Sequence, residues 1–143
     1  MRWIIKNALS LLPSNIYTMM ENEIATLIVQ SAFKVRKDLG LGLLEGAYEK
    51  ALKHELESVG LVVSDQQTIP VMYDGQQVES GFRADLIVND CVAIELKTVS
   101  AIAPVHKAQL LTYLHFLDLK LGLIINFNSY NLRDGIRRVA NGL

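Results

Sequence analysis

Residues 84–97 read ADLIVNDCVAIELK, and this stretch decides the fold because two apolar runs flank a short polar turn signal. The first run carries Asp85, and the second carries Glu95, Leu96 and Lys97. Side chains two positions apart in a strand share a face, so Glu95 and Lys97 point the same way while Leu96 points to the core. Burying two carboxylates and an ammonium group is costly unless they pair or hold a metal. The pattern therefore predicts a functional site on a hairpin.

The register of this hairpin determines whether the two acids meet. A two-residue turn would set Asp85 opposite Ile94 and mix polar with apolar faces, whereas a three-residue loop would set Asp85 opposite Glu95. Register follows the hydrophobic pattern, so we expect the three-residue loop or an equivalent bulge. Opposed carboxylates repel each other, and a divalent cation between them would reverse that effect. This register pairs Leu86 with Ile94, Ile87 with Ala93, and Val88 with Val92.

The composition is that of a globular domain. The chain has 143 residues, of which 50% are hydrophobic and 20% are charged, which suits one domain with its own core. A net charge of −1 gives no global attraction to nucleic acid, so a phosphate partner must meet a local patch. The single cysteine, Cys91, lies in an apolar run and indicates a buried thiol in a reducing compartment. No apolar run approaches the length of a membrane span, and we expect a cytoplasmic protein.

The first 19 residues read as an extension that precedes the folded domain. Polar residues and Pro13 interrupt the apolar start, which disfavours a secretion signal. Met20 directly precedes a strong helical pattern. We therefore expect an upstream extension, or a mis-assigned start codon, over residues 1–19 and a single domain over residues 20–143.

The remaining pattern alternates between helices and strands. The turn signal Asp74-Gly75 predicts a hairpin, and Pro70 indicates an edge strand or an irregularity. Together the segments predict an α/β fold with an αβββαβ core, in which helices flank a mixed sheet. The expected helices cover residues 21–39, 43–59, 104–117 and 131–140, and the expected strands cover 61–73, 76–82, 84–88, 92–97 and 121–127.

The hairpin motif resembles the PD-(D/E)xK motif of restriction-endonuclease-like nucleases. Asp85 followed by Glu95-x-Lys97 has the required order of an acid and an E-x-K tripeptide. Ala84 stands where the name of the superfamily has proline, and Arg36 stands where many members are expected to carry histidine.

Two further motifs support the same resemblance. Residues 42–48, GLLEGAY, match the G-x-x-E-x-x-Y signature of the GxxExxY protein family, a branch of that superfamily. His106, Gln109 and Tyr113 fall where RecB-like and related members carry a helical Q-x-x-x-Y motif. The similarity covers residues 20–143 and implies a restriction-endonuclease-like fold.

The resemblance also implies a metal ion that assists phosphodiester hydrolysis. Mg²⁺, with Mn²⁺ as a substitute, prefers carboxylate oxygens in octahedral geometry with retained waters. Asp85 and Glu95 would bind the ion directly, and the Leu96 carbonyl would be a third ligand. Glu45 would contribute through water or at a second metal.

Catalytic roles follow from the same resemblance. Lys97 would sit beside the attacking water, either as a base or as a protonated group that stabilises charge. Gln109 would orient a phosphate or the water, and Tyr113 would pack against the site or form a hydrogen bond to it. Glu45 would act from the second helix.

A purely structural account of these residues has to be weighed as well. Lys97 could form a plain ion pair with Glu95 or Asp85, and Glu45 could be an ordinary solvated acid. Tyr48 lies on an apolar stripe and is expected in the core, where its hydroxyl needs a partner.

Three functions of different classes are compatible with the sequence. The first is a Mg²⁺-dependent nuclease acting on DNA rather than RNA, working as a homodimer because symmetric pairing cuts both strands most simply. The second is a nucleic-acid-binding module that does not cleave. The third is a subunit of a larger repair or defence complex, which the near-neutral charge permits.

Overall fold

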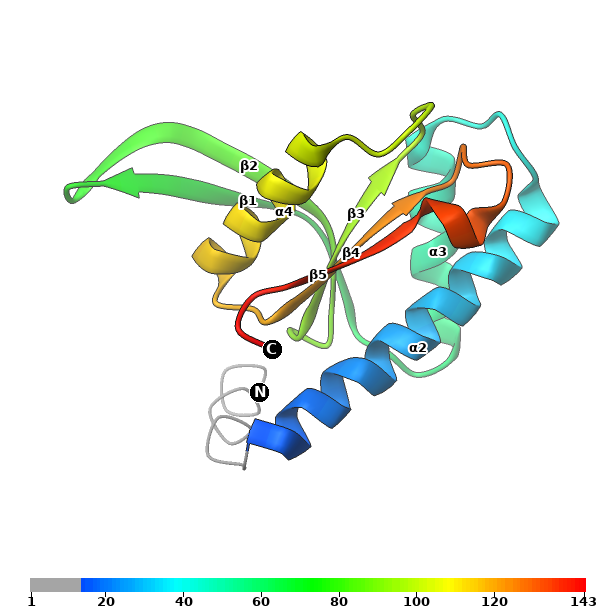
Figure 1. The fold of residues 1–143 in the computed structure, drawn as a ribbon, viewed down its shortest axis with the longest axis horizontal. Coiled ribbons are helices and arrows are strands. Elements are labelled where there is room, and N and C mark those ends of the chain that lie inside the picture. Colours follow the sequence, from blue (N-terminus) through cyan, green and yellow to red (C-terminus); the bar gives the residue numbers. More distant parts are fainter. Residues whose placement is uncertain (1–13) are drawn as a thin grey trace.

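The computed structural model describes residues 14–143, with side chains for residues 20–65, 68, 70–78 and 83–143. The predicted fold class is confirmed, because five strands form a mixed sheet flanked by helices, consistent with a restriction-endonuclease-like core (Figure 1). No helix in the described part of the chain has the length and apolar character needed to cross a bilayer. The elements are α2 (Ser14–Leu39), α3 (Glu45–Ser58), β1 (Val63–Tyr73), β2 (Gln76–Val88), β3 (Val92–Lys97), α4 (Pro104–Leu117), β4 (Leu121–Asn126), the 3₁₀ turn η1 (Leu132–Gly135) and β5 (Ile136–Ala140).

The sheet has the strand order β1-β2-β3-β4-β5, and only β3 and β4 run parallel. A parallel pair needs a crossover connection, which α4 supplies. The carboxyl ends of β3 and β4 therefore lie side by side, and the Phe127 backbone N–H donates to the Lys97 carbonyl at 2.9 Å. The E-x-K tripeptide ends at this edge of the sheet.

The predicted hairpin register is confirmed. β2 and β3 pair Leu86 with Ile94, Ile87 with Ala93, and Val88 with Val92. Residues 89–91 form the three-residue loop, and both Asn89 and Asp90 adopt φ of 52°. These two residue types tolerate a positive φ better than most, which explains the polar pair at the turn.

Alternation along the strands divides the core between two faces. On one face, α2 and α3 cover the larger apolar side chains of the hairpin, including Leu86 and Ile94. On the other, α4 covers Ile87 and Ala93. Asp85 and Glu95 share the parity of Ile87 and Ala93, so the acids stand on the α4 side, as the register predicts.

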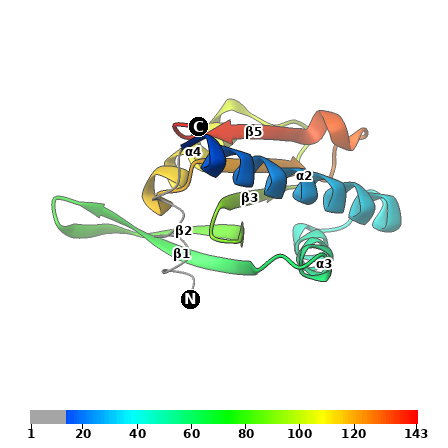
Figure 2. The same cartoon turned by 90° about the horizontal axis from the view of Figure 1, so that it is seen from below.

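The outer halves of β1 and β2 leave the sheet as a two-stranded arm, defined here as residues 66–82 (Figures 1 and 2). The Asp74-Gly75 hairpin is confirmed, with Tyr73 paired to Gln76. The expectation for Pro70 is also confirmed, because β1 is an edge strand and its register shifts between Ile69 and Val71. The two segments expected over residues 76–88 form one continuous strand.

The helix predicted over residues 131–140 is wrong. The segment forms η1 and then β5, which pairs antiparallel with β4 from Leu121–Ala140 to Ile125–Ile136. The apolar strand β4 needs a partner on its second edge, and β5 supplies it. Gly135 allows the tight approach, since a Cβ there would lie 2.7 Å from the Asn126 carbonyl oxygen.

Two helix boundaries also differ from the prediction. The first helix begins at Ser14, seven residues before the expected start at residue 21. The second spans Glu45–Ser58 and is shorter than the expected helix over residues 43–59. Leu44 and Val59 cap its two ends, and both are exposed. The division into an extension over residues 1–19 and a domain over 20–143 stays a prediction, and residues 1–13 lie outside the described part.

Glu21 gives a stability prediction that depends on pH. Its side chain is fully buried, and neither carboxylate oxygen has a hydrogen-bond partner among the described residues. Burial raises its pKa from 4.5 to about 6, although Lys120 and Arg138 oppose the shift. A raised pKa means that the folded state binds the proton more tightly, so the charged carboxylate reduces stability above pH 6 and the penalty fades toward pH 4.5.

Glu21→Gln is therefore expected to raise the melting temperature at pH 8 and to change it much less at pH 5. Scanning calorimetry at both pH values tests this, with the exposed Glu23→Gln as the control. A melting temperature that falls at pH 8 would contradict the prediction.

Candidate functional site

Asp85 lies where β2 and β3 separate, directly beyond the last paired residues of the two strands. Its Oδ2 accepts a hydrogen bond from the Leu96 backbone N–H at 2.8 Å. The side chain thus links β2 to β3 just beyond the point where backbone pairing between the two strands ends. Burial raises the pKa of Asp85, while this hydrogen bond and the charges of Lys97 and Arg83 lower it. The carboxylate is thus held rigidly in a partly dry position.

Glu95 and Lys97 extend from the same face of β3. Lys97 Nζ lies 3.6 Å from Glu95 Oε1, and both side chains are largely buried. Burial raises the pKa of Glu95 to about 7, and repulsion by Asp85 adds to the shift while Lys97 opposes it. Glu95 and Lys97 therefore form a close pair that lies within electrostatic reach of Asp85.

Glu45 is the first residue of α3 and is exposed. Its charge contributes to the raised pKa of Glu95, after the larger effects of burial and Asp85. The start of α3 therefore brings an acid within electrostatic reach of Glu95.

Tyr48 anchors the loop that precedes Glu45. Its hydroxyl donates to the Gly40 carbonyl at 2.6 Å and accepts from the Leu43 N–H at 3.3 Å. Its buried ring stacks on Phe127 with centroids 4.5 Å apart. The core position expected for Tyr48 is confirmed, and its hydroxyl holds the loop that precedes Glu45.

Tyr48→Phe tests this anchoring. Losing the hydroxyl leaves the Gly40 carbonyl without its donor and should cost about 1–2 kcal/mol of stability. Denaturant unfolding measures this loss, and Tyr73→Phe, at an exposed position, is the control. Unchanged stability would contradict the anchoring role.

Two residues of α4 were expected to contribute to the site. Burial raises the pKa of Tyr113, and the charges of Glu95 and Asp85 raise it further, so Tyr113 lies within electrostatic reach of both acids. Gln109 precedes it by one turn and is exposed. His106 caps α4 instead, because its Nδ1 accepts from the Ala103 N–H at 3.0 Å.

Asn126 is a positioning residue that sequence reasoning missed. It is buried, its Oδ1 accepts from the Val99 N–H at 3.0 Å, and its Nδ2 donates to the Val99 carbonyl at 2.8 Å. These bonds fix the chain that follows Lys97. A lone amide at the end of the all-apolar strand β4 is the signal that could have revealed it.

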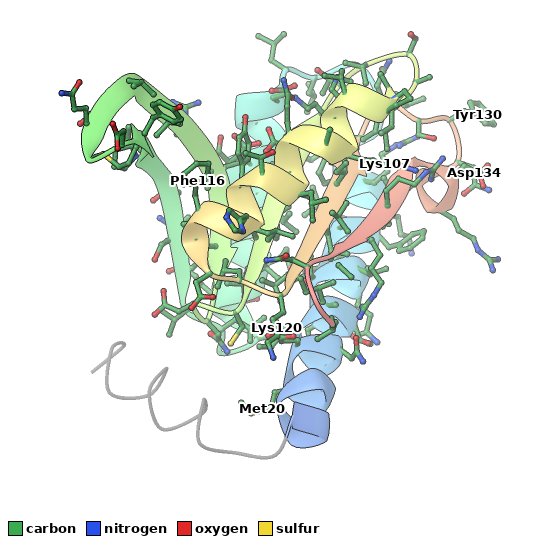
Figure 3. The ribbon with its side chains drawn as sticks, turned by 60° about the vertical axis from the view of Figure 1, so that its left-hand side comes forward. Met20, Lys107, Phe116, Lys120, Tyr130 and Asp134 are labelled. Atoms are coloured by element: carbon green, nitrogen blue, oxygen red, sulfur yellow. The ribbon has the colours of Figure 1, made fainter. Side chains whose placement is uncertain are left out.

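Arg36 is not part of the site. Its guanidinium donates to the Phe127 carbonyl and to the Tyr130 carbonyl, both at 2.9 Å. It thereby ties the end of α2 to the loop after β4, where Tyr130 stands out from the body (Figure 3).

The converging donors fit a hard divalent cation. No group of three acidic, histidine or cysteine side chains that could hold an ion occurs among the described residues. Mg²⁺ needs no such cage, since it keeps several waters and binds through one or two carboxylates. Asp85 and Glu95 supply these, and their mutual repulsion is what a cation would relieve. Direct ligation by Leu96 or Glu45 stays a prediction.

Comparison with known proteins agrees with this geometry. The sequence-family model of the PD-(D/E)XK nuclease superfamily matches residues 22–139, from the first half of α2 into β5. Nucleases of this superfamily generally use divalent metal ions, and membership implies an interaction with nucleic acid. No curated protein and no solved structure matches the chain. Assignment to the GxxExxY branch stays a prediction.

Proposed function

Because the chain belongs to the PD-(D/E)XK nuclease superfamily, we propose that it is a metal-dependent nuclease that hydrolyses phosphodiester bonds in DNA. The observation that carries the proposal is the pair of carboxylates, Asp85 and Glu95, held on adjacent strands beside Lys97. This set matches the order of acids and lysine in the superfamily motif.

Mg²⁺ is the proposed cofactor, with Mn²⁺ as a substitute. Asp85 and Glu95 would hold it, with the Leu96 carbonyl as a further ligand and Glu45 acting through water. When bound, such an ion polarises the phosphate and acidifies a water molecule. The Leu96 N–H fixes one oxygen of Asp85 and leaves the other for a ligand.

Lys97 and the α4 residues complete the proposed machinery. Lys97 either accepts a proton from the attacking water or remains protonated and stabilises charge on the phosphate. Tyr113, whose pKa is raised by burial and then by the charges of Glu95 and Asp85, would support the orientation of the acids. Gln109, one turn nearer the start of α4, orients the phosphate.

The proposed substrate is DNA, with RNA as the less favoured choice. The net charge of −1 means that binding depends on local cations. Arg83 is exposed beside Asp85, and Lys107 projects from the exposed side of α4 (Figure 3). Phosphate contacts of this kind would carry no sequence information, so we expect a weak sequence preference.

A cleavage assay tests the function directly. Purified full-length protein is incubated with labelled single-stranded, duplex and branched DNA and with RNA, in Mg²⁺, Mn²⁺ or EDTA. We expect cleavage of DNA with either metal and none in EDTA. Cleavage that persists in EDTA, or no cleavage of any substrate, would refute the proposal.

A nucleic-acid-binding module that does not cleave is the second candidate. It is favoured by the exposure of Glu45 and by the lack of a three-donor group among the residues that the structure describes. Binding that is steeply reduced by salt, without cleavage by the wild-type protein, would support it.

Metal binding is expected to weaken as the pH falls. Burial raises the pKa of Glu95 to about 7, so below pH 7 most Glu95 side chains carry a proton. A cation then has to displace that proton before it can bind. The affinity for Mg²⁺ should fall by up to about tenfold between pH 7 and pH 6. Titration calorimetry at pH 6, 7 and 8 measures this, and equal affinities at all three would contradict the assignment of Glu95.

A further inference from the structure

Tyr130 has the most exposed large apolar side chain in the described part of the chain, at 92%. It stands in the segment between β4 and η1, residues 127–131, which we call the β4–η1 loop, and it projects from the body of the molecule (Figure 3). The loop begins beside the candidate site, because the Phe127 N–H donates to the Lys97 carbonyl at 2.9 Å. An aromatic side chain is therefore displayed to water from the sheet edge at which the E-x-K tripeptide ends.

The backbone of the β4–η1 loop is fixed by hydrogen bonds, although Tyr130 itself buries little surface. The Arg36 guanidinium donates to the carbonyls of Phe127 and Tyr130, both at 2.9 Å. The Ser129 hydroxyl donates to the Asn131 carbonyl at 2.8 Å. A side chain exposed to this degree adds little to stability, whereas a rigid backbone that presents it lowers the entropy cost of binding a ligand. The loop therefore has the properties of a preorganised contact.

The surroundings of Tyr130 suit a nucleobase better than a protein surface. Asn128 and Asn131 expose amides in the same loop, and Arg133 exposes a cation directly after it. Leu132, the apolar residue between them, is buried. Protein partners are usually received by a contiguous apolar patch, which these neighbours do not form. An aromatic ring beside a cation is instead the combination that holds single-stranded nucleic acid, with the ring stacked on a base and the cation near a phosphate.

The charge of the protein gives stacking more weight than phosphate contact. The net charge is −1, and the exposed Asp134 offsets part of the charge of its neighbour Arg133. Electrostatic attraction to a phosphate backbone is therefore weak here, and affinity has to come from another source. Stacking on an aromatic ring supplies it, because every base has a flat face.

We propose that Tyr130 stacks on an unpaired base, so that the site acts on single-stranded DNA or on unpaired nucleotides at ends and branches. This inference rests on the proposed nuclease function and adds the class of substrate to it. Bases inside a duplex are already stacked on one another, so Tyr130 offers nothing to an uninterrupted duplex. Stacking is tolerant of base identity, so the site selects the structure of the strand and not its sequence.

Binding of labelled DNA in EDTA tests the proposal without cleavage. Tyr130→Ala should weaken binding of a single-stranded oligonucleotide about tenfold, and should change binding of a long blunt duplex by less than about twofold. Tyr130→Trp should bind the single strand at least as tightly as the wild-type protein, because it keeps a stacking face. Tyr73→Ala removes another exposed tyrosine, on the arm, and is the matched control that should leave both affinities unchanged.

Fluorescence of the Tyr130→Trp variant reports the contact directly. Trp3 is the single native tryptophan, so a Trp3→Phe background leaves one emitter. Stacking on a base quenches indole emission. Single-stranded DNA should quench the signal strongly, and the long duplex should leave it nearly unchanged. Unquenched emission at saturating single-stranded DNA would overturn the proposal.

The remaining outcomes separate stacking from the nuclease function. Equal single-strand affinities in the wild type and Tyr130→Ala, or an equal loss on both kinds of DNA, would overturn the proposal even if the wild type cleaves. The expected binding differences without any cleavage would support the stacking and refute the nuclease. If Tyr130→Ala leaves DNA binding unchanged but releases a co-purifying protein, the loop serves a protein partner and the proposal fails.

Discussion

Asp85→Asn is expected to reduce metal-dependent cleavage by about 10³-fold or more, because it removes one of the two strand carboxylates that we propose to hold the ion. The amide oxygen can still accept the Leu96 N–H bond that Asp85 Oδ2 accepts at 2.8 Å, so the fold should persist. The pKa of Asp85 is raised by burial, and a neutral amide suits that position. The loss should therefore be one of function and not of stability.

Three measurements on this variant check the expectation: single-turnover cleavage, Mg²⁺ affinity by calorimetry, and thermal melting. Asp38→Asn is the matched control, since it removes an exposed acid at the end of α2. A variant that keeps a tenth or more of wild-type activity would show that Asp85 is not a metal ligand.

Lys97→Met is expected to reduce cleavage by roughly 10²- to 10³-fold, the usual cost of losing a group that stabilises transition-state charge. Methionine preserves most of the apolar stem that Lys97 buries beside Glu95. Removing the ammonium group also removes an effect that lowers the pKa of Glu95, so that pKa should rise above about 7.

The second effect distinguishes a catalytic lysine from a structural one. The pH at which Mg²⁺ affinity begins to fall should shift upward in Lys97→Met, while DNA binding at low salt should change little. Lys50→Met, exposed on α3, controls for the loss of one positive charge. Full activity in Lys97→Met would show that Lys97 has no catalytic role and serves only as an ion-pair partner of Glu95.

Local patterns predicted the parts of the fold that depend on neighbouring residues. The hairpin at residues 84–97 was predictable because only one register separates the acids from the larger apolar side chains. The same holds for the Asp74-Gly75 turn and for Pro104 at the start of α4.

Features set by distant contacts were not predictable. Residues 131–140 carry no strong period that would distinguish a strand from a helix, and β5 is a strand because β4 has an open edge beside it. Arg36 bonds to carbonyls 91 and 94 residues further along the chain, so its role depends on tertiary structure alone. The proximity of Glu45 to the strand acids was implied by a motif and could not be derived from spacing.

The three-residue loop at 89–91 limits the insertions and deletions that this part of the chain can accept. Its residues could be exchanged for others that accept a positive φ, but its length could not drift by one, because a single insertion or deletion would turn Asp85 and Glu95 to opposite sides of the sheet. We therefore expect natural variation here to consist of substitutions or of paired length changes, while the tip of the arm tolerates additions freely.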